Sequence, residues 1–209
     1  MSMNPRFRWG QPPIMLLAVC CGVTGCVAGT SQHESFREWK EEVKLNDGRV
    51  ILVNQKWRCA RIGKYNTGKE YCSTLRESWL TFSLPEISNR EIEWNEQFLP
   101  LVFNVYKGQL YIVGIVDGTQ WLVYGKPQPP YISYRWNVNG WHPISFNEIP
   151  ETIYKTNMAT EFPPVESPFL FKVDAKERSN NRASLPKPYK RILPDLRFDA
   201  DIRFEVNHE

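Results

Sequence analysis

The stretch LPLVFNVYKGQLYIVGIV, residues 99–116, decides the fold class of this chain. Residues 99–106 and 110–116 are rich in apolar and β-branched side chains, and the pair Lys107-Gly108 between them is typical of a turn. This pattern predicts two adjacent strands. Because residues 110–116 are apolar on both faces, we expect them to form a central strand of the sheet.

Hairpin patterns lie on both sides of this pair of strands. Asp47-Gly48 separates residues 41–45 from the apolar run 50–53, which predicts an N-terminal hairpin. Before residue 41 a capped helical turn is the alternative to a strand, since Ser31 and Glu34 precede Phe36, Trp39 and Val43.

The chain after residue 116 continues the β pattern. Asp117-Gly118 predicts a turn into a strand at 121–124, and residues 131–138 predict a further strand that turns back at Asn139-Gly140. Residues 196–206 alternate between apolar and charged side chains, which predicts a half-buried terminal strand.

Two segments depart from this strand pattern. Pro150 at a first helical turn predicts a short helix near 150–158. Residues 161–195 are rich in proline and then basic, which indicates a long surface excursion that is either solvated or in contact with anionic headgroups or wall polymers. We therefore expect an antiparallel β-sandwich or a partly open barrel with one short helix.

The two cysteines of the β-rich region are Cys59 and Cys72, which flank the turn-like stretch 65–69. This spacing predicts a disulfide that joins the two arms of a hairpin. A metal site is a poor alternative because the sequence has no Cys-x-x-Cys and no histidine nearby. We expect no cofactor.

The first 26 residues have the parts of an export signal. Arg6 and Arg8 precede an apolar run at 14–23, which is too short for a membrane-spanning helix because spanning takes about 20 apolar residues. The run ends in Val23-Thr24-Gly25-Cys26, which resembles the lipobox of bacterial lipoproteins. An uncleaved anchor or a soluble secreted product are the alternatives.

The lipobox resemblance implies that Cys26 carries diacylglycerol and that residues 1–25 are removed as a signal peptide. Cys20 and Cys21 are rival acceptors, but the residues before them fit a cleavage site poorly. Val27 after the cysteine is expected to direct the lipoprotein to the outer membrane, on its periplasmic face. The remaining organisation is then a tether at 26–38 and a single domain at 39–209.

Loss of the signal also removes two positive charges, which leaves 24 basic against 23 acidic residues. The mature chain is therefore almost neutral, and nucleic acid is not an expected partner.

Candidate binding residues gather in the predicted hairpin around Asn139-Gly140. If these two residues form the turn, Tyr134, Trp136 and Val138 share one strand face and Arg135 lies on the other, with Val138 opposite Trp141. Aromatic side chains in strands usually pack in a core, but flat rings near an arginine also stack on sugars or on a partner's side chains. The candidate ligand contacts are Tyr134, Arg135, Trp136 and Trp141.

Catalytic patterns are sparse. His142 is expected to be a surface histidine, with a catalytic triad as the alternative. Glu91, Glu93 and Glu96 around Trp94 are expected to form a solvated face, with a carboxylate pair for glycan cleavage as the alternative.

The sequence thus predicts a non-enzymatic envelope lipoprotein, a binding or assembly module. Acyl chains on Cys26 would hold it to the membrane, and an envelope protein or the cell wall would be its partner. The alternative is an envelope hydrolase that acts on glycan or peptide.

Overall fold

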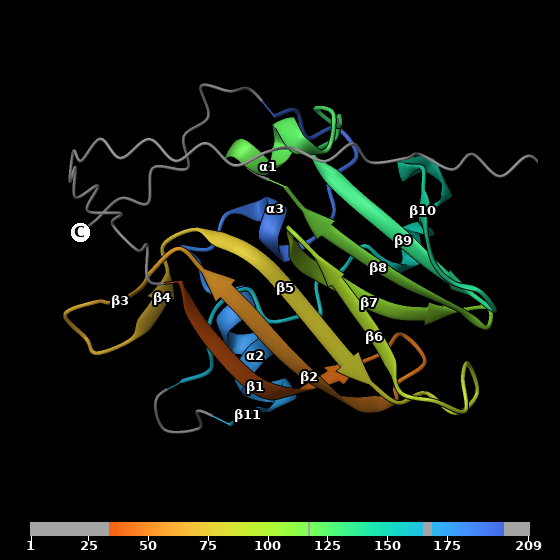
Figure 1. Cartoon of the computed structure of the whole chain (residues 1–209), viewed down its shortest axis with the longest axis horizontal. Helices are drawn as coiled ribbons and strands as arrows, with labels where there is room; N and C mark the ends of the chain where they lie inside the picture. Colours follow the sequence, from red (N-terminus) through yellow and green to blue (C-terminus); the bar gives the residue numbers. More distant parts are fainter. Residues whose placement is uncertain (1–33, 117, 165–168, 199–209) are drawn as a thin grey trace, which may run out of the picture. The chain divides into compact units, whose positions relative to one another are not determined.

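The computed structural model describes residues 34–116, 118–164 and 169–198, and the chain there is mainly β (Figure 1). One sheet has the strand order β11-β1-β2-β5-β6, a second has the order β10-β9-β8-β7, and β3 pairs with β4 in a small hairpin. All neighbours are antiparallel except β1 and β11. The predicted fold class is confirmed, since the described residues are mainly β, form no closed barrel and are consistent with a β-sandwich.

The strands have the following bounds: β1 (Ser35–Lys44), β2 (Val50–Cys59), β3 (Ile62–Lys64), β4 (Glu70–Cys72), β5 (Leu75–Phe82), β6 (Ile92–Glu96), β7 (Leu99–Tyr106), β8 (Gln109–Ile115), β9 (Tyr131–Asn137), β10 (Gly140–Ile144) and β11 (Leu170–Phe171). The helical segments are α1 (Gly118–Val123), α2 (Val173–Asn181), α3 (Lys187–Lys190) and two 3₁₀ turns, η1 (Phe146–Glu148) and η2 (Glu151–Ile153).

Strands β7 and β8 are adjacent, as the apolar run at 99–116 predicts, and supply side chains to two buried clusters. β8 lies between β7 and β9, and nearly all of its side chains are buried. Leu110 and Ile112 face the other sheet, whereas Tyr111 and Val113 pack under Ile153 and its neighbours on the opposite side. Both faces of β8 are covered, which explains why its sequence lacks the polar alternation of a half-exposed strand.

The predicted N-terminal hairpin is confirmed in strands β1 and β2. Gly48 in its turn has a φ of +89°, a left-handed conformation that favours glycine. β1 begins at Ser35, so a strand replaces both the possible helical turn and the part of the tether predicted at 35–38. Its alternation turns Trp39 and Val43 inward, and this period-two burial outweighs the helix-cap pattern.

A shared core holds the two large sheets together. The rings of Phe82 on β5 and Phe103 on β7 meet edge to face with centroids 4.5 Å apart. Further fully buried residues from both sheets complete this core, among them Val43, Val53, Leu80, Ile92, Leu110 and Ile112. The hydrophobic effect of this buried layer is the main force that joins the sheets.

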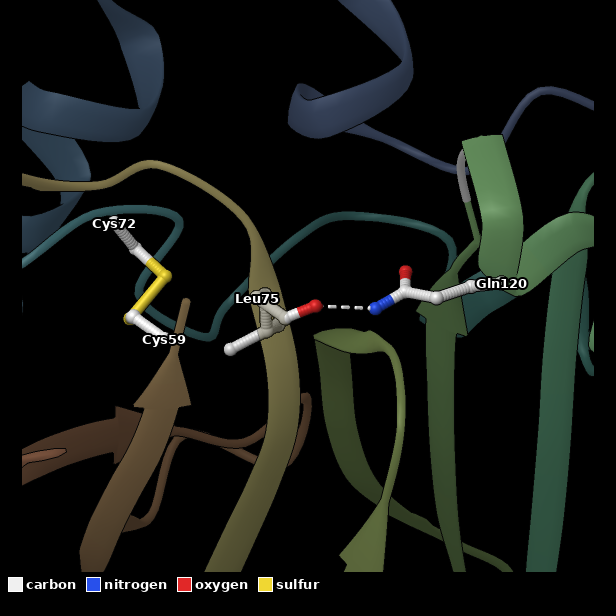
Figure 2. The surroundings of a disulfide bond; sticks show 4 residues. All are labelled: Cys59, Cys72, Leu75 and Gln120. Atoms are coloured by element: carbon white, nitrogen blue, oxygen red, sulfur yellow. Dashed lines mark hydrogen bonds between the residues drawn. A yellow bond between two sulfur atoms is a disulfide. The ribbon is translucent and has the colours of Figure 1, made fainter. Parts of the chain in front are cut away.

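The strand predicted at 121–124 is wrong, because these residues belong largely to α1. Tyr124 N donates to the carbonyl of Gln120, so one helical turn separates these two side chains. Gln120 Nε2 donates to the carbonyl of Leu75 at 2.6 Å, as Figure 2 shows. The hydroxyl of Tyr124 donates to the carboxylate of Glu96 on β6. The helical turn therefore lets both side chains bind the first sheet, whereas a strand would hold them farther apart.

The helix predicted near 150–158 is present as the short turn η2, with Ile153 fully buried. The segment at 161–195 differs from the predicted surface excursion. It contributes α2, which packs beside β1, and it buries Lys176, Leu185 and Ile192. In Figure 1 α2 lies behind β1 and β2, and this places it on the core side of the first sheet.

The predicted terminal strand at 196–206 is not seen in its described part, since residues 196–198 have no strand pairing. Phe198 packs instead on Trp121, with ring centroids 4.8 Å apart. Residues 199–206, the signal at 1–25, Cys26 and the tether up to residue 33 lie outside the described residues.

Candidate functional site

An open groove of about 1010 Å³ crosses the outer face of the first sheet. Three consecutive residues from each of four neighbouring strands line it, together with one further residue of β2, the residue before β11 and the first residue of β11. These lining residues are 38–40, 54–56, 79–81, 93–95, Leu52, Phe169 and Leu170. The groove therefore runs across the strands rather than along them.

The strand register explains why the groove has two sides. The middle residue of each triplet turns inward, and these four residues, Trp39, Gln55, Leu80 and Trp94, pair across β1, β2, β5 and β6. Side chains alternate along a strand, so the residues that flank them turn outward in two rows. The tryptophan row is Glu38, Lys56, Trp79 and Asn95, and the polar row is Lys40, Asn54, Thr81 and Glu93.

The tryptophan row is organised around one ammonium group. Lys56 Nζ lies 2.9 Å from Glu38 Oε1 and 5.6 Å from the centroid of the Trp79 ring. It also lies 5.1 Å from the ring of Phe36, which is 6.3 Å from Trp79. Cation–π contacts and the ion pair hold Lys56 in place between the two rings.

The polar row has unused hydrogen-bonding capacity. Within the described parts of the chain, the side chains of Lys40, Asn54, Thr81 and Glu93 have no hydrogen-bond or ion-pair partner. An ammonium group, an amide, a hydroxyl and a carboxylate thus stand side by side on four strands. Between them they offer both donors and acceptors to a ligand.

The charges of the groove cancel. Glu38 and Glu93 supply two carboxylates, and Lys40 and Lys56 supply two ammonium groups. Leu52 on β2, which is 48 % exposed, and Phe169 just before β11, which is 79 % exposed, add apolar surface to the groove. Aromatic and apolar contacts with a few polar groups are typical of a site that binds a ligand by shape and hydrogen bonds.

The predicted ligand contacts around β9 and β10 lie elsewhere. Tyr134, Trp136 and Trp141 pack together at the margin of the shared core, and Trp136 meets Trp141 edge to face at 5.2 Å. Trp141 Nε1 donates to the carbonyl of Glu93 at 2.8 Å. Arg135 turns to the opposite face, 3.7 Å from Glu148. The structure thus joins the three aromatic residues through packing and leaves the arginine apart from them.

The turn between β9 and β10 differs by one residue from the prediction. Asn137 pairs with Gly140 and Trp136 pairs with Trp141, so the two-residue loop is Val138-Asn139. Gly140 has a φ of +121°, and Val138 is 97 % exposed at the tip rather than opposite Trp141. The predicted division of faces still holds, because this shift changes only the position of the turn.

Glu96 has an inward role that separates it from the predicted acidic set. Its two carboxylate oxygens accept hydrogen bonds from the hydroxyls of Tyr124 and Tyr134, each at 2.5 Å. Burial raises the pKa of both tyrosines, and the hydrogen bonds to Glu96 raise it further. Glu93 points outward from the same strand into the groove, so the structure does not bring these two carboxylates together.

His142 lies on the exposed face of β10. Its Nε2 is 2.9 Å from Oδ1 of Asn137, across the hairpin turn. The structure thus pairs this histidine with an amide of the same hairpin.

The predicted disulfide between Cys59 and Cys72 is confirmed (Figure 2). Their Cα atoms are 5.5 Å apart, and the bridge closes the hairpin of β3 and β4 at its base. Backbone hydrogen bonds between Ala60 and Thr74 and between Ser73 and Arg61 continue the pairing beside the bridge. The small hairpin is therefore fixed to the end of β2.

Sequence reasoning missed the groove because its rows join residues that are far apart along the chain. The available signal was the outward half of the alternation in β1, β2, β5 and β6, where Phe36, Leu52 and Trp79 add large apolar side chains to polar neighbours.

Ranges 34–116, 118–164 and 169–198 contain no cluster of histidine, cysteine and carboxylate side chains suited to a metal ion. The same ranges contain no helix long and apolar enough to cross a membrane. Comparison with known proteins finds no family model, no curated protein and no solved structure that matches this chain.

Proposed function

We propose that this chain is a lipid-anchored, non-enzymatic binding or assembly module of the bacterial envelope, and that the groove on the first sheet is its binding surface. The observation that carries the proposal is the polar row, four side chains in register that have no partner among the described residues and lie beside the tryptophan row. Such a row suits reversible recognition, since its donors and acceptors are already in place.

The proposed cellular location is the periplasmic face of the outer membrane, with acyl chains on Cys26 as the anchor. The lipobox resemblance of residues 23–26 supports it, and the disulfide fits an oxidising compartment. Eight residues separate Cys26 from the start of β1 at Ser35. At about 3.5 Å per residue they reach at most about 30 Å, so the domain would bind a partner close to the membrane.

The anchor is tested by metabolic labelling with a fatty-acid analogue. We expect Cys26→Ala to abolish labelling, while Cys20→Ala and Cys21→Ala, the two rival acceptors, keep it. Labelling that persists in Cys26→Ala would contradict the lipidation site.

The binding surface is tested by photo-crosslinking in intact cells. A photoreactive amino acid replaces Thr81 or Leu52 in the groove, and Val138 or Leu122 on other exposed surfaces as matched controls. We expect irradiation to produce a shifted adduct from the groove positions and not from the controls. Equal adducts at all four positions, or none at any, would contradict the proposal.

A further inference from the structure

We infer that the ligand of the groove is an uncharged, extended β-1,4-linked hexopyranose chain that lies across the strands. This inference rests on the proposed function and specifies the chemistry of its ligand. It follows from the direction of the groove, from the side chains of the two rows and from their charge balance.

The direction of the groove favours a repeating ligand. Lys40, Asn54, Thr81 and Glu93 stand on four adjacent strands, so neighbouring members are separated by about 4.8 Å, the spacing between strands. An extended β-1,4-linked sugar chain advances by a similar distance with each pyranose ring. Each ring can therefore meet the next member of the polar row, and three strand spacings cover about 14 Å.

The side chains provide the two kinds of contact that a pyranose ring requires. The hydroxyl groups at its edge are both donors and acceptors, which matches the amide of Asn54 and the hydroxyl of Thr81. Its faces carry C–H groups, which pack on an aromatic ring such as Trp79. Lys56 and Phe36 hold the indole from one side, so Trp79 is positioned before the ligand arrives.

An extended peptide is a poorer fit to this surface. Its backbone needs hydrogen-bond partners, but β2 and β5 in the middle of the groove already pair with a strand on each side. Peptides that add a strand bind at a sheet edge rather than across a face. A polyanion is disfavoured as well, because the two lysines of the rows are balanced by Glu38 and Glu93.

The test uses the full chain in detergent micelles with two probes, the β-1,4-linked hexamers of N-acetylglucosamine and of glucose. Binding is measured by calorimetry and by tryptophan fluorescence. We expect at least one hexamer to bind, and Trp79→Ala to weaken binding about tenfold or more, as expected for a central aromatic contact. Trp79→Tyr should restore part of the affinity because it keeps an aromatic face.

A second variant covers the case in which Trp79→Ala disturbs the sheet. Thr81→Arg fills the middle of the groove and leaves Trp79, Lys56 and Phe36 in place, and we expect it to abolish binding with an unchanged thermal midpoint. Val138→Ala, at the exposed hairpin tip, is the matched control and should bind like the wild type.

The inference is overturned if neither hexamer binds, or if Thr81→Arg binds as the wild type does. The crosslinking experiment separates this failure from failure of the proposed function. If groove positions still give adducts in cells while both hexamers fail, the groove is a binding surface for another ligand. If those adducts are also missing, the proposed function fails as well.

Discussion

Lys176 is a buried charged side chain that joins α2 to β1. Its Nζ lies 3.8 Å from Glu41 Oε2 and donates to the carbonyl of Glu42, and both Lys176 and Glu41 are almost fully buried. Burial lowers the pKa of Lys176 and raises that of Glu41, and the two opposite charges resist these shifts. A buried pair of this kind stabilises little as a whole, but removal of one partner leaves a buried charge without compensation.

We therefore expect Lys176→Met to lower the free energy of unfolding by about 3–5 kcal/mol, as breaking a buried ion pair does. The double variant Glu41→Gln/Lys176→Met should recover most of this loss, since it removes both charges. Urea denaturation measures both effects, with Lys155→Met as an exposed control. Equal losses in the single and double variants would contradict the role of the pair.

At the level of elements, Glu161 fastens the β3–β4 hairpin to α2. Its carboxylate accepts hydrogen bonds from Arg182 and Ser179 and lies 2.7 Å from Lys69 Nζ. Burial is the largest single influence and acts to raise the pKa of Glu161, but the donors together hold it below its ordinary value of 4.5. The ionised form is thus favoured in the folded state.

Glu161→Gln should lower the free energy of unfolding by about 1–3 kcal/mol near neutral pH, because it weakens charge-assisted hydrogen bonds. The contribution of the ionised carboxylate is complete above pH 4.5 and is lost as the pH falls through the lower folded-state pKa. The difference in free energy of unfolding between the wild type and Glu161→Gln should therefore disappear in acid. Urea titrations at several pH values measure it, and a gap independent of pH would contradict this account.

The disulfide fastens the same hairpin to β2. We expect Cys59→Ala/Cys72→Ala to lower the free energy of unfolding by about 3 kcal/mol, since the bridge closes a loop between positions 13 residues apart. The comparison requires oxidised wild type and the double variant under the same denaturant series. A loss no greater than that of Val138→Ala would show that the bridge adds nothing.

The elements also show what the sequence could predict. The pattern of apolar segments beside glycine turns identified β1, β2, β7 and β8, with alternation in β1 and continuous apolar runs in β7 and β8, which are buried on both faces. It failed for α1, whose Trp121, Leu122 and Val123 suit a strand equally well until Gln120 and Tyr124 bind the first sheet. α2 had no apolar stripe to detect, because a lysine and an asparagine fill its buried positions.

For the whole molecule, Glu96 is a polar link between the two sheets. It lies on β6, and its carboxylate accepts hydrogen bonds from the hydroxyl of Tyr134 on β9 and from that of Tyr124, just after α1. The groove also depends on contacts between distant parts of the chain, because its two rows form only when β1, β2, β5 and β6 pair in the observed register. Such a register depends on packing between distant segments, so no local pattern of residues predicts it.

Tyr134→Phe should lower the free energy of unfolding by about 1–3 kcal/mol, since one oxygen of Glu96 loses its donor. The wild type should also lose stability in alkali. Because burial and Glu96 raise the pKa of both tyrosines, their contribution is complete below pH 10 and is lost as the pH rises through the folded-state values. Chemical denaturation on both sides of pH 10 measures this, with Tyr65→Phe as an exposed control.

The most direct test of the account is hydroxyl-radical footprinting of the wild-type chain in intact envelopes and after purification in detergent. If the outer face of the first sheet binds a partner, oxidation of Trp79 and Leu52 will fall severalfold in envelopes, while Leu122 on α1 reacts equally in both samples. Equal oxidation of Trp79 in the two samples would show that the groove is empty in the cell and would contradict the central claim.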